Sequence, residues 1–253
     1  MVGVAAGPAL TIPFVFPAVG QSWRLDFLIW TVPVVVAALL YLVIAPREQP
    51  EPQDEAREMP RWWPDWKSPV LWLLALTFGS NNALYYTVNG FLADFLNSRG
   101  EGAWIAATLD WTNGSQLAAS FLLLSIAERI KLRAWPYLVF GPLPLAGVLG
   151  IIFGHGWWIV AGGTLVGFSL AFTFVLTFAL PAALSAPGGV HRMAGGMFAI
   201  SYIIAVIVPV LSGAFWDLTG LPWTLFLPVV VCGITLTALG FLLTLRAHIS
   251  PHV

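Results

Sequence analysis

The chain has 253 residues, of which 58% are hydrophobic and 9% are charged, and its mean hydropathy is +0.85. A soluble domain carries about 25% charged residues, so the composition excludes an ordinary soluble protein and predicts an all-α polytopic membrane protein. The formal net charge is −1 and the two lysines are Lys67 and Lys131, which leaves no basic stripe for nucleic acid. A single cysteine, Cys232, excludes a disulfide or a thiolate metal site within one chain.

Apolar runs long enough to cross a bilayer recur along the whole chain. The shortest connections between them are helical-hairpin turns at 154–156 and near 219–221. We therefore expect about eight transmembrane helices. They fall at about residues 1–19, 25–45, 69–96, 103–127, 134–153, 157–184, 194–215 and 222–245.

One long polar segment, 46–67, interrupts this series. Its first part is rich in Pro and Glu, the composition of a disordered linker. Its last part contains Trp62, Trp63 and Trp66, which predicts a stretch lying against the lipid headgroups. The expected organisation is two spans in 1–45, a linker in 46–67 and a six-helix bundle in 68–253.

The basic residues of the loops predict the orientation in the membrane. Nine of them fall on one side of the expected spans and two, Arg24 and Arg99, fall on the other. We therefore expect a multi-pass protein of the cell (inner) membrane whose linker and both termini are cytoplasmic. The nine are Arg47, Arg57, Arg61, Lys67, Arg129, Lys131, Arg133, Arg192 and Arg246.

Two neighbouring runs carry polar side chains that an apolar helix does not ordinarily hold. At about 100° per residue, those of run 69–96 fall within roughly 140° of its surface and those of run 103–127 within roughly 120°. Each helix is therefore polar on one face, and the two faces are expected to meet each other or a water-filled cavity. The first set is Asn81, Asn82, Tyr85, Tyr86 and Asn89, and the second is Asp110, Asn113, Gln116 and Ser120.

These polar residues admit two interpretations. In one, their amides form hydrogen bonds that hold helices together; in the other, they contact substrate or water along a pathway. Asp110 lies about 9 Å inside the run, counting from Trp104, so it is either an interfacial residue or a proton-coupling group. Asn113 and Gln116, about 13 and 18 Å deep by the same count, cannot reach the surface.

Polarity also varies along the last six runs with a period of three. Runs 134–153 and 222–245 carry nothing more polar than Thr or Tyr, whereas the two runs before each are more polar. Run 194–215 contributes Ser201 and Tyr202 near mid-depth as further candidate substrate-binding residues. The pattern predicts two three-helix repeats, 69–153 and 157–245, as found in secondary transporters.

Several short motifs resemble the major facilitator superfamily across the whole sequence. Gly3-x-x-x-Gly7-Pro8, followed by Ser22-Trp23-Arg24, resembles the fifth span of the family and the turn after it. Glu128-Arg129-x-Lys131-x-Arg133 is similar to the charged loop between its eighth and ninth spans. The runs 82–92 and 191–197 are most similar to the branch that contains cyanate and 2-nitroimidazole permeases.

This resemblance implies secondary transport of a small solute, with two bundles rocking around a midplane site and a proton or substrate gradient as the driving force. It also implies that Glu128 and Arg129 act in a gating loop. The chain corresponds to the last eight of twelve spans, so a truncated product, or a short one needing a partner chain, is expected. The alternative function is a non-transporting remnant or accessory membrane subunit.

Enzyme chemistry is not expected, and neither is a cofactor. Lys67-Ser68 follows Asp65-Trp66 rather than the glycines of a phosphate-binding loop. Ser169 has no histidine at membrane depth to act as its base. The four histidines are scattered through loops and the tail, so no metal site is expected. They are His155, His191, His248 and His252.

Overall fold

The computed structural model describes residues 10–44, 63–185 and 188–249, and every regular element in these ranges is helical. The chain divides into two compact units, residues 2–61 and 62–253. Each unit is described by itself.

The first unit contains one long helix, α3 (Trp23–Ile44), which is apolar and exposed along its length. Before it come a π-helical turn, Thr11–Val15, and the short helix α2 (Phe16–Ala18). The Trp30 indole N–H donates to the Thr11 hydroxyl at 2.8 Å and ties these turns to α3. The expected span at 1–19 lies only partly within the described residues, where it consists of short turns.

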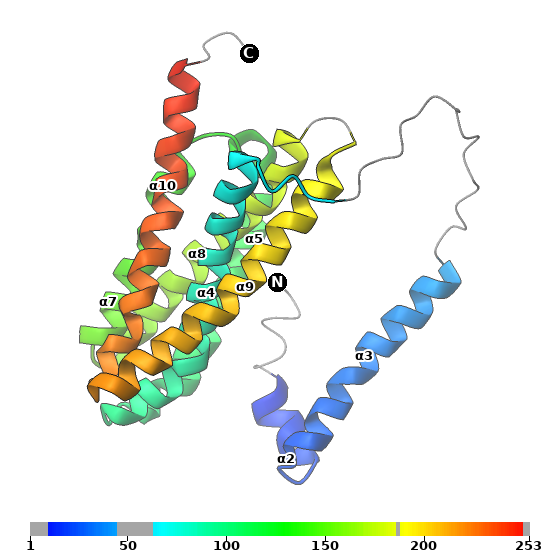
Figure 1. The fold of residues 1–253 in the computed structure, drawn as a ribbon. Helices are drawn as coiled ribbons and strands as arrows, with labels where there is room; N and C mark the ends of the chain where they lie inside the picture. The colour runs from blue at the N-terminus through cyan, green and yellow to red at the C-terminus, as the bar shows by residue number, and fades with distance from the viewer. Residues whose placement is uncertain (1–9, 45–62, 186–187, 250–253) are drawn as a thin grey trace. The chain divides into compact units, whose positions relative to one another are not determined.

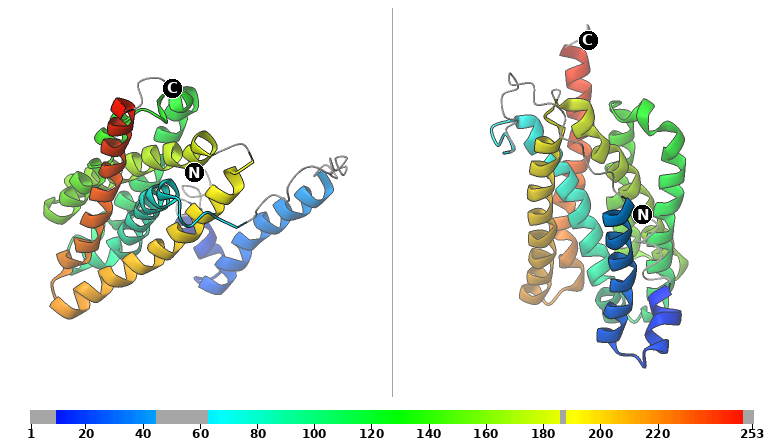
Figure 2. Two further views of the ribbon diagram at one scale, coloured as in Figure 1. Left: turned by 45° about the horizontal axis from the view of Figure 1, so that its top comes forward. Right: turned by 90° about the vertical axis from the view of Figure 1, so that its right-hand side faces the viewer.

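The second unit is built from seven α-helices, and Figures 1 and 2 show the longest of them running beside one another. Ser68 caps the first helix by accepting a hydrogen bond from the Leu71 N–H, and Pro69 occupies its first position. Gly220 ends another helix in the left-handed conformation, at φ 69°. The helices are α4 (Pro69–Ser98), α5 (Ile105–Ile130), α6 (Trp135–Phe140), α7 (Leu143–Phe153), α8 (Trp157–Leu184), α9 (Val190–Thr219) and α10 (Leu227–Ile249).

Five helical segments in the described residues are long and apolar enough to cross a membrane, which indicates a membrane protein. They do not include α4 and α5, although these helices have 30 and 26 residues. These are the two helices that carry the amides. The expected all-helical class is confirmed for the described residues, whereas the count of eight spans stays a prediction. The five segments are Trp23–Ile44, Trp135–Phe153, Trp157–Leu184, Val190–Thr219 and Pro222–Leu242.

The helices of the second unit pair according to a pseudo-twofold rule. If α4, α5 and α6–α7 form one half and α8, α9 and α10 the other, the first helix of each half packs along the second helix of the other. Thus α4 lies beside α9, and α5 lies beside α8. The third element of each half packs on the first helix of the other, α10 on α4 and α7 on α8. This is the pairing that two inverted three-helix repeats would give.

Glycine contacts give the directions of these pairs. Gly196 of α9 faces Leu71 and Gly213 faces Phe91, so α9 runs parallel to α4. On the other side, Gly163 of α8 lies against Thr108 of α5, and farther along the two helices Gly167 lies against Thr112. The α5–α8 pair is therefore parallel as well, as the pseudo-twofold rule requires.

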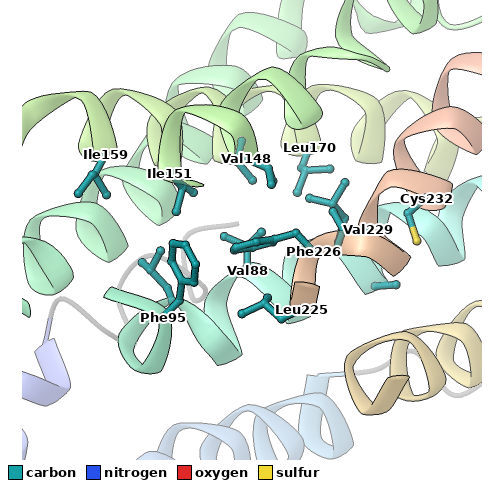
Figure 3. Close-up of a cluster of buried hydrophobic side chains, with 14 of the residues drawn as sticks. Val88, Phe95, Val148, Ile151, Ile159, Leu170, Leu225, Phe226, Val229 and Cys232 are labelled. Carbon is teal, nitrogen blue, oxygen red and sulfur yellow. The ribbon is translucent and has the colours of Figure 1, made fainter. Parts of the chain in front are cut away.

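Two buried apolar clusters fill the second unit. One joins α4, α7, α8 and α10, and Figure 3 shows its side chains converging from these helices. The Phe95 and Phe226 rings meet edge to face within it, with centroids 5.1 Å apart. The other cluster surrounds Phe78, whose ring contacts Phe174 and Phe198. A layer of polar side chains occurs within the same bundle.

Candidate functional site

Two adjacent asparagines of α4 connect this helix to two of its neighbours in the bundle, α8 and α9. Asn81, 3% exposed, donates from Nδ2 to the Leu170 carbonyl at 3.0 Å and to the Thr173 hydroxyl at 2.6 Å, both on α8. Asn82 donates from Nδ2 to the Ser201 hydroxyl on α9 at 2.9 Å. The two side chains share one turn of α4, so α8 and α9 are both hydrogen-bonded to that turn.

Asn113 of α5 is a second centre of hydrogen bonding and is 2% exposed. Its Oδ1 accepts from the Tyr85 hydroxyl at 2.8 Å and from Gln116 Nε2 at 3.1 Å. Its Nδ2 donates to Asn89 Oδ1 at 3.0 Å and to the Leu109 carbonyl at 2.9 Å. An amide offers two lone pairs and two N–H groups, so all four hydrogen-bonding positions of Asn113 are used within the bundle.

The remaining predicted residues divide between buried and open positions. Gln116 is 4% exposed and belongs to the buried layer, while Tyr85 and Asn89 are half-buried. On α9, Ser201 is fully buried against Asn82, whereas the next residue, Tyr202, is 55% exposed and stacks on Phe198.

The structure thus gives seven of the eight predicted substrate-binding residues hydrogen-bond partners, in three sets that run from α4 to α8, α9 and α5, and places Tyr202 on the surface next to Ser201. The seven are Asn81, Asn82, Tyr85, Asn89, Asn113, Gln116 and Ser201.

Asp110 lies on the exposed side of α5, three residues before Asn113. Tyr86 is exposed in the same way on α4, one residue after Tyr85. Both residues border an open face of the bundle, because a Cβ added at Gly90 of α4 or at Gly114 of α5 would meet no other atom within 4 Å. The polar layer is therefore closed on its inner side and open beyond Asn89 and Asn113.

The predicted gating residues, Glu128 and Arg129, lie in the last turn of α5, just before the turn that leads to α6. Glu128 forms an exposed ion pair with Lys131, at 2.6 Å between Oε2 and Nζ. The next residue, Arg129, is also exposed. The Lys131 carbonyl accepts a hydrogen bond from the buried Tyr137 hydroxyl at 2.9 Å, which fixes the loop against α6. These contacts order the loop, and its gating role stays a prediction.

Two contacts escaped the sequence reasoning. Thr173 is the α8 partner of Asn81, and its i, i+4 relation to Ser169 was the available signal. Arg99, after α4, donates from Nη1 to the Ile151 carbonyl at 2.6 Å and from Nη2 to the Gly154 carbonyl at 2.9 Å. It thereby satisfies carbonyls at the end of α7, which a helix leaves unpaired. Nothing in the spacing of the sequence pairs Arg99 with that helix end.

The site offers amide and hydroxyl groups but no activated nucleophile. In the described ranges, 10–44, 63–185 and 188–249, no three His, Cys, Asp or Glu side chains lie close enough together to hold a metal ion. The site offers reversible hydrogen bonding, and the exposed carboxyl of Asp110 lies at its border.

Comparisons with known proteins leave this geometry as the main guide to function. The sequence matches no protein-family model, and no curated protein matches it either.

Proposed function

We propose that this chain forms a helical bundle of a secondary active transporter for a small solute, and that the open α4–α5 face lines the pathway. The observation that carries the proposal is the position of Asp110 and Tyr86. They are exposed on helices that also bury four amides. A carboxyl facing hydrocarbon is costly, and a water-filled pathway removes that cost.

The pairing of the helices supports the same proposal. Inverted repeats in transporters place the substrate site at the interface between the two halves, near mid-depth. Here Asn81 of α4 and Thr173 of α8, from the first helix of each half, are hydrogen-bonded to each other. Because the open face leaves one side of the site uncovered, a second helical bundle is needed to enclose the pathway. The resemblance to the major facilitator superfamily fits this arrangement and is part of the proposal.

The proposed roles follow from chemistry and position. The amides and hydroxyls of the polar layer, with Tyr202 beside it, contact the solute, and Asp110 takes up and releases the coupling proton. In the described ranges, no Lys or Arg lies between the end turns of α4, α5, α8 or α9. This bundle therefore supplies no fixed cation for an anionic solute, which favours a neutral or cationic one.

The proposal is tested by asking whether the open face is wet. Cys232→Ser gives a background without cysteine, since Cys232 is the single native one. Gly90→Cys and Gly114→Cys then place a thiol where there is open space. A permanently charged, membrane-impermeant thiol reagent reacts with thiolates in water but is excluded from hydrocarbon. Both cysteines are expected to react in membrane vesicles.

Leu149→Cys is the matched control, because Leu149 is exposed on α7, one of the apolar segments. It is expected to stay unlabelled. If the cysteines at positions 90 and 114 are as unreactive as the cysteine at position 149, the face is covered by lipid or protein, and the proposal that it lines a pathway is wrong. The amides would then act only in helix packing, as in an accessory membrane subunit.

A further inference from the structure

The contact between α4 and α5 differs from the other helix contacts of the bundle. Although these helices are consecutive, α4 packs chiefly along α9 and α5 chiefly along α8. Within the part of the chain that the structure describes, Asn113 makes two hydrogen bonds between α5 and α4, from the Tyr85 hydroxyl and to Asn89 Oδ1. Gln116 of α5 also interacts with the Tyr85 hydroxyl. The polar connection between the two helices is therefore centred on Asn113 and Tyr85.

Each helix is anchored elsewhere by contacts that do not involve Asn113. Asn81 and Asn82 hold α4 to α8 and α9. Ser115 holds α5 to α8 by donating to the Thr164 carbonyl at 3.1 Å. The α4–α5 contact can consequently separate while both helices keep their other partners.

The polar groups at this contact can be satisfied in two arrangements. When α4 and α5 are joined, Asn113 uses all four of its hydrogen-bonding positions. When they part, Asn113 keeps its bonds to Leu109 and Gln116, which belong to its own helix. Tyr85 and Asn89 of α4 lose their bonds to Asn113, but both residues are half-buried and border the open face, where water can reach them. A two-state element requires that neither state leave buried polar groups unpaired.

We propose that Tyr85, Asn113 and Asn89 form a reversible clasp, and that its opening admits water from the face at Gly90 and Gly114 to the buried layer. Gln116, behind the clasp, is the first buried side chain that the water would reach. Hydrogen bonds between helices in a membrane are individually weak, so thermal motion is enough to break and remake two of them. The clasp rests on the proposed function, because it needs water at the open face, but the distances measured below test it without a transport or thiol-reactivity assay.

The test measures the α4–α5 separation directly. In the Cys232→Ser background, spin labels are attached at Gly90→Cys and Gly114→Cys, where an added Cβ meets open space. Pulsed electron resonance then gives the distribution of distances between them. Asn113→Leu removes both hydrogen bonds of Asn113 to α4 and is expected to raise the population with the longer distance roughly eightfold. Tyr85→Phe removes one bond and is expected to raise it about threefold.

Asn82→Leu is the matched control, because it removes a buried amide of α4 whose partner is on α9 rather than α5. It is expected to leave the distances unchanged. Thermal unfolding of each variant identifies those that fail to fold, and Tyr85→Phe, the mildest change, then decides the result. The clasp is refuted if Tyr85→Phe and Asn113→Leu keep the parental distances, or if Asn82→Leu lengthens them as much.

Discussion

At the scale of single residues, the site depends on amides that cost free energy unless they are paired. An unpaired amide in an apolar medium costs several kcal/mol, and Asn81 avoids that cost by donating two hydrogen bonds to α8. Its acceptor Thr173 also donates to the Ser169 carbonyl at 3.1 Å. A short chain of hydrogen bonds thus connects α4 to the middle of α8.

Asn81→Leu removes this connection while keeping a side chain of similar size. We expect it to destabilise the protein by about 0.6 to 2 kcal/mol, the range measured for hydrogen bonds between membrane helices. Thr173→Val should cost less when Asn81 is already Leu, because the two residues share a bond. Thermal unfolding of both single variants and the double variant in detergent measures the coupling. Asn97→Leu, on the exposed end of α4, is the control and should change little.

Asp110 leads to a prediction about energy coupling. Asp110→Asn keeps the shape and the hydrogen bonding of the side chain but removes its ability to titrate. In the transporter that we propose, assembled with its second bundle, we expect this change to abolish accumulation driven by a proton gradient while leaving counterflow largely intact. Paired transport assays on both sides of neutral pH measure the two activities. Accumulation equal to that of the parent at every pH would show that Asp110 is only an interfacial residue.

The sequence revealed which residues are polar at depth, but not with what they pair. Asn81, Asn82 and Asn113 stand out because amides are unusual in apolar helices. The partners of the first two lie 89 to 119 residues farther along the chain, on α8 and α9. Helix periodicity predicts the face of the helix on which a residue lies, but not which helix packs against that face. The use of all four hydrogen-bonding positions of Asn113 could therefore be seen only in the three-dimensional structure.

At the scale of helices, the close packing of α5 on α8 depends on glycine. A Cβ at Gly163 would come within 2.5 Å of the Thr112 hydroxyl, and one at Gly167 would overlap the Thr112 carbonyl. Glycines four residues apart are typical of closely packed helices, and here the partner helix is α5. Because the obstacle at Gly167 is backbone, it cannot move aside as a side-chain end can.

Gly167→Ala should therefore separate α5 from α8. We expect a loss of stability of about 1–3 kcal/mol, the usual cost of overpacking, and a lower unfolding temperature in detergent. Gly114→Ala is the matched control on α5, since its Cβ meets open space. It should be neutral or slightly stabilising, because alanine favours a helix more than glycine does. Equal losses for the two variants would contradict the packing argument.

Element boundaries show where periodicity stops being informative. The apolar run 134–153 predicted one helix, but the structure has α6 and α7, separated at Gly141 and Pro142. The local reason is Pro142, which has no N–H to donate to the Leu138 carbonyl. The structure adds that Gly141 lies against the backbone of Thr237 on α10. Similarly, α9 begins at Val190, earlier than its apolar run, and Arg192 in its first turn donates from Nε to the Trp63 carbonyl at 2.7 Å.

At the scale of the whole second unit, charge is distributed unequally between its two ends. The start of α4, the turn between α5 and α6 and the start of α9 lie at one end, because consecutive long helices reverse direction and α9 is parallel to α4. The opposite end, with the loop between α4 and α5, has Arg99 as its one Lys or Arg within the described residues. The basic residues of the first end are Lys67, Arg129, Lys131, Arg133 and Arg192.

This asymmetry carries the prediction of topology. Lys and Arg near the ends of spans are retained on the cytoplasmic side, so the end with Lys67 should be cytoplasmic and the end with Arg99 external. The linker before Lys67 then lies in the cytoplasm. A reporter that is active only in the cytoplasm, fused after Glu55, should be active, and the same reporter inserted at the exposed Gly100 should be silent. A second reporter that is active only outside should give the opposite pair of results. Activity of the external reporter after Glu55 would show that the bundle has the opposite orientation. Asp110 would then lie near the cytoplasmic end, where it could not receive protons from outside.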